Sequence, residues 1–117
     1  MRKLVNVIKA LSDETRIRII KVLLERDCCV CEVMQALDIS QSRASRNLSI
    51  LEEVGFINST RDAMWVVYSI NRHSDECVNS LLQMMRSCVE DDELVKMDRE
   101  RLAGATRDYC RDYRNPE

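Results

Sequence analysis

A three-residue interruption between two apolar helical segments places the tightest constraint on how this chain folds. Val33, Met34 and Leu37 share one face of the first segment. Ser40 ends the interruption, and the second segment, residues 41–54, starts directly after it. Serine is a residue type that caps helices, and two helices joined by so short a turn are typical of a helix-turn-helix.

Apolar residues at helical spacing predict three further helices around this pair. Two precede it, at residues 4–11 and 15–25, and one follows it, at residues 74–89. The apolar stripe of the last helix is wider than a single small domain needs, so we expect a dimer to cover it.

Two strand-like segments follow the helix-turn-helix. Residues 56–60 and 64–70 are joined by Arg61, Asp62 and Ala63, which predicts a β-hairpin with Arg61 at its tip. Two glycines and one proline among 117 residues favour a helical fold with short turns. The expected architecture is therefore mainly α with a small β-hairpin, a winged helix-turn-helix.

Charge is distributed unevenly along the chain. The formal net charge is −2, yet residues 1–72 carry eleven basic and nine acidic side chains, whereas residues 73–117 carry seven and eleven. The basic excess suits a polyanion such as DNA, and we expect the acidic part to face away from it. We therefore divide the chain into a DNA-binding and dimerisation domain, residues 1–90, and a charged C-terminal extension, residues 91–117, that is helical in part.

Membrane, disulfide and enzyme roles find no support in the sequence. No apolar segment approaches the ~20 residues that a membrane-spanning helix needs, so we expect a cytoplasmic protein with no membrane partner. In a reducing cytosol the six cysteines stay thiols unless chemistry uses them. Without a glycine-rich phosphate loop, paired histidines or a second domain, we expect neither an enzyme nor a small-molecule substrate.

Three cysteines, Cys28, Cys29 and Cys31, stand within four residues at the start of the first helix of the pair. Cys29 and Glu32 occupy capping-box positions, although sulfur accepts hydrogen bonds weakly. A helix N-terminus favours the thiolate, which is the form that binds soft ions. In an ideal helix Cys29 and Cys31 would point about 200° apart, so one ion joins them only if the first turn is distorted. We therefore expect a soft-ion site whose occupation deforms this helix.

Three stretches of the chain resemble the ArsR/SmtB family of metal-sensing repressors, most closely its arsenic-responsive type. They are residues 10–19, 29–33 and 39–48, which read ALSDETRIRI, CVCEV and ISQSRASRNL. The resemblance implies a homodimer that pairs through its N- and C-terminal helices and represses transcription at an operator. It also implies release from DNA when trivalent arsenic or antimony binds cysteine thiolates.

The second helix of the pair is the expected recognition helix. No acidic residue lies between Ser40 and Ile50, and the amide, hydroxyl and guanidinium donors there can reach base edges and phosphates. The resemblance implies that the hairpin arginine contacts the flanking minor groove or phosphates. The expected DNA-binding residues are Gln41, Ser42, Arg43, Ser45, Arg46 and Arg61.

The expected ligand set departs from the pattern of the family. Trivalent arsenic prefers three thiolates, but the family's third position, three residues after the second cysteine, holds Met34. We therefore expect the ligands to be Cys28, Cys29 and Cys31, with Cys110 of the tail as the alternative third ligand.

Other uses of the same cysteines stay open. Cadmium or lead can replace arsenic as the inducer, and oxidation or persulfidation can replace metal binding altogether. A structural zinc module would lose its fold to a chelator, and a thiol reductase is the distant alternative. The favoured function takes operator DNA as its partner and arsenite or antimonite as its inducer, and it requires no cofactor for folding.

Overall fold

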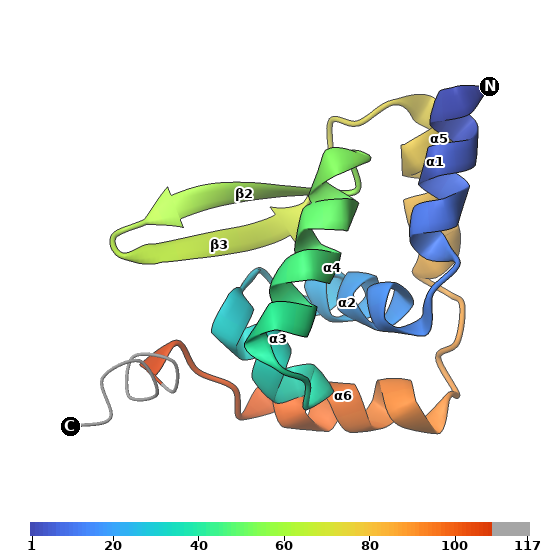
Figure 1. Cartoon of the computed structure of the whole chain (residues 1–117). Helices are drawn as coiled ribbons and strands as arrows, with labels where there is room; N and C mark the ends of the chain where they lie inside the picture. The colour runs from blue at the N-terminus through green and yellow to red at the C-terminus, as the bar shows by residue number, and fades with distance from the viewer. Residues whose placement is uncertain (109–117) are drawn as a thin grey trace.

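The computed structural model describes residues 1–108, which form a body of helices with a small sheet extending from one side (Figure 1). The elements in chain order are α1 (Arg2–Leu11), α2 (Glu14–Glu25), β1 (Cys28–Cys29), α3 (Val30–Leu37), α4 (Gln41–Glu53), β2 (Ile57–Asp62), β3 (Trp65–Ile70), α5 (Glu76–Met85) and α6 (Glu93–Ala103). Helices α3 and α4 form the predicted helix-turn-helix, and β2 and β3 project from the body as a wing (Figure 1). No helix within these residues has the length and apolar character required to cross a bilayer.

Local backbone chemistry sets both ends of α4. The Ser40 hydroxyl accepts a hydrogen bond from the Arg43 N–H at 3.2 Å, and Asp38 ends α3 with a left-handed φ of 55°. Gly55 has φ 94°, and a Cβ there would lie 3.0 Å from the Ser74 hydroxyl oxygen. Glycine is therefore required where α4 leads into the wing.

The wing is a hairpin with a shorter turn than the sequence predicts. Strands β2 and β3 pair over their full lengths, so Asp62 lies opposite Trp65 and only residues 63–64 form the turn. Ala63 supplies the positive φ, 56°, that such a turn needs. The predicted tip is wrong, because Arg61 lies within β2 rather than in the turn.

Strand β1 has no counterpart in the sequence-based prediction. It pairs antiparallel with β3, Cys28 with Tyr68 and Cys29 with Val67, and gives the sheet the order β1-β3-β2. Two residues are too few to show an alternating pattern, and their partners lie far along the chain. The segment that starts α3 is therefore hydrogen-bonded to the wing.

The last predicted helix ends earlier in the structure. Helix α5 stops at Met85, and Val89, predicted to be helical, has φ 52°. The ammonium group of the buried Lys21 donates to the Met85 carbonyl at 2.8 Å and lies 3.1 Å from a Glu90 carboxylate oxygen. A buried cation thus satisfies the end of α5 and holds the turn that follows.

Helix α6, from the expected charged extension, packs against α2 and α3 (Figure 1). The buried Asp98 accepts two hydrogen bonds of 2.8 Å from the Arg18 guanidinium and a third, of 3.1 Å, from Arg101. The largest fully buried apolar side chains of the core beneath it are Phe56, Ile19, Ile20, Leu37, Leu48, Leu51 and Ile57.

Candidate nucleic-acid interface and thiol site

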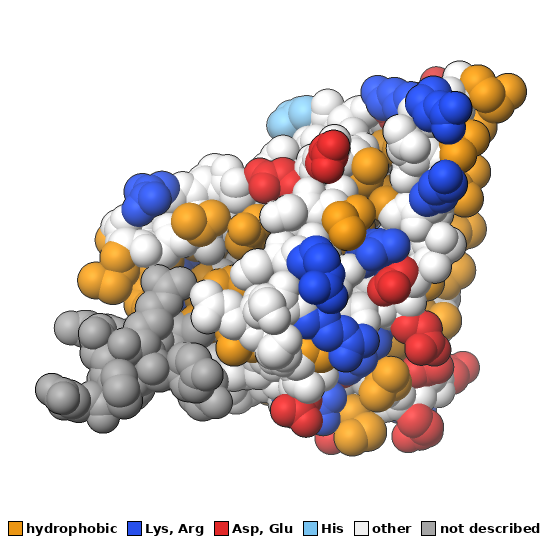
Figure 2. Space-filling model, in the orientation of Figure 1, with side chains coloured by type: hydrophobic (Ala, Val, Ile, Leu, Met, Phe, Trp, Pro, Cys, Tyr) orange, Lys and Arg blue, Asp and Glu red, His pale blue; other side chains and the backbone are white. Residues whose placement is uncertain are grey.

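The N-terminal half of α4 carries a polar, exposed surface. Gln41, Ser42, Arg43 and Arg46 are exposed and Ser45 is half-buried, whereas the apolar residues of α4 point into the core. Figure 2 shows Lys and Arg side chains grouped over the central part of this face of the molecule. The structure thus places the five expected recognition residues of α4 outside the core, in the N-terminal half of the helix.

Hydrogen bonds from α2 fix the position of α4. The Arg16 guanidinium donates to the Asn47 side-chain oxygen at 2.9 Å and to the Ala10 carbonyl at 2.6 Å. Arg43 donates to the Thr15 hydroxyl at 2.6 Å, so its exposed side chain is also anchored. Sequence reasoning missed Arg16 and Asn47, although Asn47 lies at helical spacing among buried apolar residues, which signals a buried polar contact.

Two neighbouring residues of the wing, Arg61 and Asp62, have different surroundings. Arg61 is exposed and lies opposite Val66, one residue pair in from the turn. The neighbouring Asp62 accepts a hydrogen bond of 2.9 Å from Arg107, which follows α6. The segment after α6 therefore reaches the wing.

The three clustered cysteines face two different environments. Cys29 is the N-cap of α3 with an extended backbone (φ −79°, ψ 170°), and Cys31 is the second helical residue; both are buried and pack with Met34 and Trp65. Successive strand residues point to opposite faces, so Cys28 enters the main core instead. The extended N-cap places Cys29 and Cys31 in one cluster without unwinding α3.

Cys31 is disulfide-bonded in this structure and does not titrate, whereas burial governs the protonation of the two thiols, Cys28 and Cys29. Burial raises the pKa of Cys28 to about 12, with Arg26 acting in the opposite direction. Burial also raises the pKa of Cys29, although the Glu32 backbone N–H favours its thiolate. The helix N-terminus thus favours the thiolate of Cys29 as expected, but desolvation outweighs this effect and favours the thiol.

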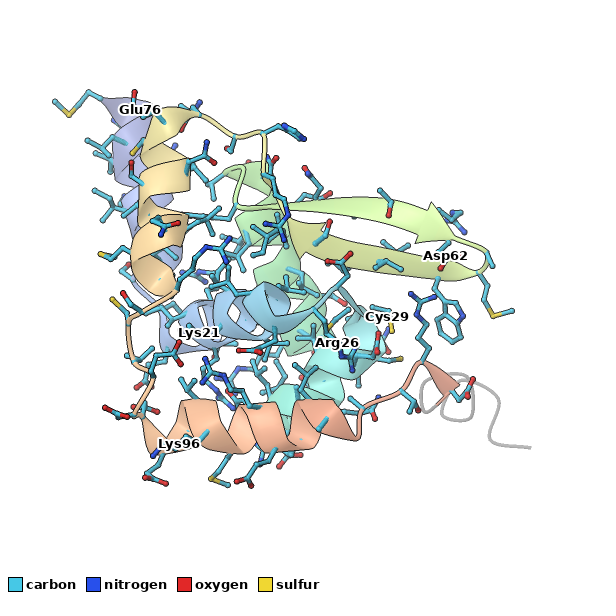
Figure 3. All side chains as sticks on the ribbon, turned by 180° about the vertical axis from the view of Figure 1, so that it is seen from behind. Lys21, Arg26, Cys29, Asp62, Glu76 and Lys96 are labelled. Atoms are coloured by element: carbon cyan, nitrogen blue, oxygen red, sulfur yellow. The ribbon has the colours of Figure 1, made fainter. Side chains whose placement is uncertain are left out.

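A buried carboxylate joins Cys29 to its surroundings. Glu32 accepts hydrogen bonds from the Cys29 N–H at 3.0 Å and from Arg26 at 2.6 Å, and Arg107 lies 3.9 Å away. Burial alone would raise the pKa of Glu32, but these two donors lower it. The predicted capping box is confirmed, and Figure 3 shows Cys29 and Arg26 close together near the start of α3. Nothing in the sequence pattern indicated Arg26 or Arg107.

A cavity of about 360 Å³ opens between α4 and the wing, and we call it the thiol cavity. Cys29, Cys31 and Trp65 line it, together with residues of α4 and β2. The structure thus brings two of the expected ligands into one cavity.

The remaining cysteines lie elsewhere. Cys77 is exposed on α5 and Cys88 is half-buried between α5 and α6, whereas Cys110 lies outside the described residues. Within residues 1–108 no three His, Cys, Asp or Glu side chains are grouped as a metal site.

Comparison with known proteins shows which family has this architecture. Residues 13–59 match the family described as "Bacterial regulatory protein, arsR family". The chain is 36% identical over 78 residues to the arsenic resistance transcriptional regulator ArsR1 of Pseudomonas putida, an alignment covering 66% of this chain and 61% of that protein. It is 39% identical over 80 residues to ArsR2 of the same organism, covering 68% of this chain and 70% of the relative.

A solved structure shares the same arrangement. The homodimeric winged helix-turn-helix DNA-binding domain of a possible ArsR-family transcriptional regulator from Mycobacterium bovis superimposes with a TM-score of 0.63 at 25% identity, covering 73% of this chain and 76% of that one. The helix-turn-helix, its polar second helix and the wing define a winged helix-turn-helix protein. The chain belongs to the ArsR family of bacterial regulatory proteins, which are transcriptional regulators rather than enzymes.

Proposed function

We propose that this protein is a cytoplasmic transcriptional repressor that binds operator DNA as a homodimer and leaves it when trivalent arsenic or antimony binds Cys29 and Cys31. The observation that carries the proposal is the thiol cavity, because it joins two cysteines to the recognition helix and the wing. The P. putida relatives, named as arsenic resistance regulators, support this choice of inducer.

Cys31 is disulfide-bonded in this structure, so a reductant must act before arsenic can bind. Two molecules of a small thiol supply the two electrons: they are joined into a disulfide as the Cys31 sulfur and its partner sulfur each become a thiol. Each As–S bond forms as a thiol proton and a hydroxyl group of arsenite leave together as water. The raised pKa of Cys29 does not oppose this step at neutral pH, because the proton leaves during the exchange. A soft ion thereby replaces protons in a buried site that disfavours bare thiolates.

Two cysteines, Cys28 and Cys110, are candidates for the third thiolate on arsenic. Cys28 would have to leave the core, where it is fully buried, and its strand pairing with Tyr68 would break. Cys110 would have to come from the tail. We therefore propose Cys29 and Cys31 as the constant pair and Cys110 ahead of Cys28 as the third thiolate.

The outer faces of α1 and α5 support the dimer. Leu4 and Ile8 of α1 and Met84 of α5 are exposed apolar side chains, and an ion pair between Lys3 of α1 and Asp75, the N-cap of α5, joins the two helices at one end. The M. bovis relative is homodimeric. We propose that these two faces meet their copies in the partner subunit.

The proposed DNA-binding residues are Gln41, Ser42, Arg43, Ser45 and Arg46 of α4 and Arg61 of the wing. Five of the six are exposed and Ser45 is half-buried; this exposure and the absence of acidic residues in this half of α4 support the assignment. The dimer would present two such helices to successive major grooves.

A gel-shift titration on DNA from upstream of the gene tests the proposal. Under reducing conditions, arsenite and antimonite should release the wild type and a Cys77→Ser/Cys88→Ser control, but not a Cys29→Ser/Cys31→Ser variant. Release of that variant by arsenite would refute the site. Release by cadmium or lead alone, or by peroxide without metal, would replace the inducer with the corresponding alternative.

A further inference from the structure

We propose that Arg107 is a positioning residue for the wing: its bond to Asp62 holds the outer part of the wing against α3 and so places Arg61 for contact with operator DNA. The inference rests on the proposed DNA contact of Arg61 and adds a role for the segment after α6. Residues 104–107 then belong to the DNA-binding unit of the chain rather than to a separate extension.

Side chains of α3 and of the loop before it fix the backbone that carries Arg107. The side-chain amide of Gln35 donates to the Thr106 carbonyl at 2.7 Å and accepts from the Thr106 N–H at 3.2 Å. Arg26 donates to two carbonyls, one at the end of α6 and one just after it, each at 3.1 Å. All four bonds end on backbone atoms, so they hold the path of the segment along α3 independently of its own side chains.

The Arg107 side chain links two elements that are far apart in the chain. Its Nη1 donates to the Asp62 carboxylate of β2 at 2.9 Å, and its Nε lies 3.9 Å from the Glu32 carboxylate of α3. Glu32 also accepts from the Cys29 N–H, so it is itself held at the start of α3. Figure 3 shows the segment after α6 extending toward Asp62. Arg107 therefore ties the wing to α3.

The outer part of the wing, residues 60–66, has one polar side-chain tie to the body. At the base of the wing, the Ser59 hydroxyl donates to the Glu52 carboxylate of α4 at 2.6 Å. Beyond this point, and within residues 1–108, Arg107 makes the one side-chain hydrogen bond or ion pair that reaches the outer wing. A two-stranded hairpin has little stability by itself, so a tie near its turn determines where its end lies.

This tie acts next to the proposed DNA contact of the wing. Asp62 directly follows Arg61, and both residues are paired with β3, so a fixed Asp62 also fixes the backbone of Arg61. A fixed wing can meet DNA together with α4 without the loss of conformational freedom that a loose wing would incur on binding. The guanidinium also offsets the charge of Asp62, whose side chain is 65% exposed and would otherwise repel phosphates.

The first test follows the wing in the protein without DNA. Trp65 is the only tryptophan of the chain, lies opposite Asp62, and packs against side chains at the start of α3. Loss of the tie should expose it, so Arg107→Ala and Asp62→Asn should each raise the acrylamide quenching constant of its fluorescence. The control is Lys96→Ala, which removes an exposed cation near the other end of α6 (Figure 3). A wild-type constant in either wing variant, or the same rise in Lys96→Ala, would overturn the proposal.

The second test measures operator binding by fluorescence anisotropy with the full-length protein. It is run without reductant, so that the Cys31 disulfide of the structure persists. Arg107→Ala should weaken binding about three- to twentyfold, because an exposed ion pair contributes up to about fivefold per wing and a dimer has two wings. Lys96→Ala should weaken binding by less than about twofold.

Two double-variant comparisons separate positioning from other roles of Arg107. In an Arg61→Ala background, Arg107→Ala should change operator affinity by less than about twofold, because no wing arginine is left to position. In an Asp62→Asn background it should also have little effect, because the tie is already lost. Full weakening in the first background would mean that Arg107 contacts DNA itself or only neutralises Asp62, and full weakening in the second would mean a direct contact. Either result would overturn the proposal.

Failure of the proposed function gives a different result. If neither the oxidised nor the reduced wild type binds DNA from upstream of the gene, the proposed function fails. If only the reduced protein binds, the wing position in this structure is not the DNA-binding one, and the positioning role alone fails. The positioning role alone also fails if the wild type and Arg107→Ala bind the operator equally well.

Discussion

Replacing Glu32 with alanine should destabilise the protein by about 2–3 kcal/mol at pH 7. The substitution removes half of a capping box, which costs ~1 kcal/mol, and a charge-assisted hydrogen bond to Arg26, which is worth ~1.5–3 kcal/mol. The Arg26 side chain is 38% exposed, so water replaces part of what it loses and the lost hydrogen bond costs ~1–2 kcal/mol. At ~4 °C per kcal/mol for a domain of this size, Tm should fall by about 8–12 °C.

The pH dependence of this loss identifies its cause. The folded protein lowers the pKa of Glu32 below its usual 4.5, so the contribution of the carboxylate is complete above that pH. It is lost as pH falls through the folded-state pKa, and the difference between wild type and variant should shrink in acid. Urea unfolding followed by circular dichroism at pH 7 and pH 3 measures both quantities.

The exposed Glu100 provides the matched control, and Glu100→Ala should change the free energy of unfolding by less than ~0.5 kcal/mol. Glu32→Gln keeps an oxygen that can accept from the Cys29 N–H and should fall between wild type and Glu32→Ala. A Glu32→Ala variant as stable as the Glu100→Ala control, or a difference that persists unchanged at pH 3, would refute this account of the capping box.

Three further predictions concern the core, the cap and the DNA-binding face. Phe56→Ala should cost ~3–5 kcal/mol in urea unfolding, because Phe56 is fully buried; a loss under 1 kcal/mol would contradict the packing. Cys29→Ser should leave the free energy of unfolding unchanged or raise it by up to ~1 kcal/mol, since serine is the better cap, while abolishing release by arsenite. Arg46→Ala should weaken operator binding and lower the slope of log affinity against log salt by about 0.9, measured by fluorescence anisotropy; an unchanged slope would exclude a phosphate contact.

Local periodicity and capping chemistry made the helix-turn-helix predictable. Ser40 begins α4 as expected, and the spacing of apolar residues located α1, α2 and α3 to within a few residues. The break between α5 and α6 was not predictable in this way. It depends on Lys21, a residue of α2 far away in sequence, which binds the carbonyl at the end of α5. Long-range polar contacts leave no periodic signal.

The thiol site shows the same division between local and long-range causes. The spacing of Cys29 and Glu32 predicted the capping box, because both partners lie within one helical turn. The burial of Cys28 in the core follows from its pairing with Tyr68, and no local pattern indicates a two-residue strand. The contact of Arg107 with the wing arises because α6 folds back over α2 and α3.

Thermodynamic linkage provides the most direct test of the claim that Cys29 and Cys31 couple inducer to operator. The factor by which arsenite weakens operator binding must equal the factor by which operator weakens arsenite binding. Isothermal titration of arsenite into the free protein and the operator complex, set beside anisotropy of the operator, measures both factors. We predict equal factors of at least ten for the wild type and for Cys77→Ser/Cys88→Ser. The Cys29→Ser/Cys31→Ser variant should show no heat of arsenite binding and an operator affinity that arsenite does not change. Arsenite binding of the same affinity in the presence and absence of operator would contradict the claim.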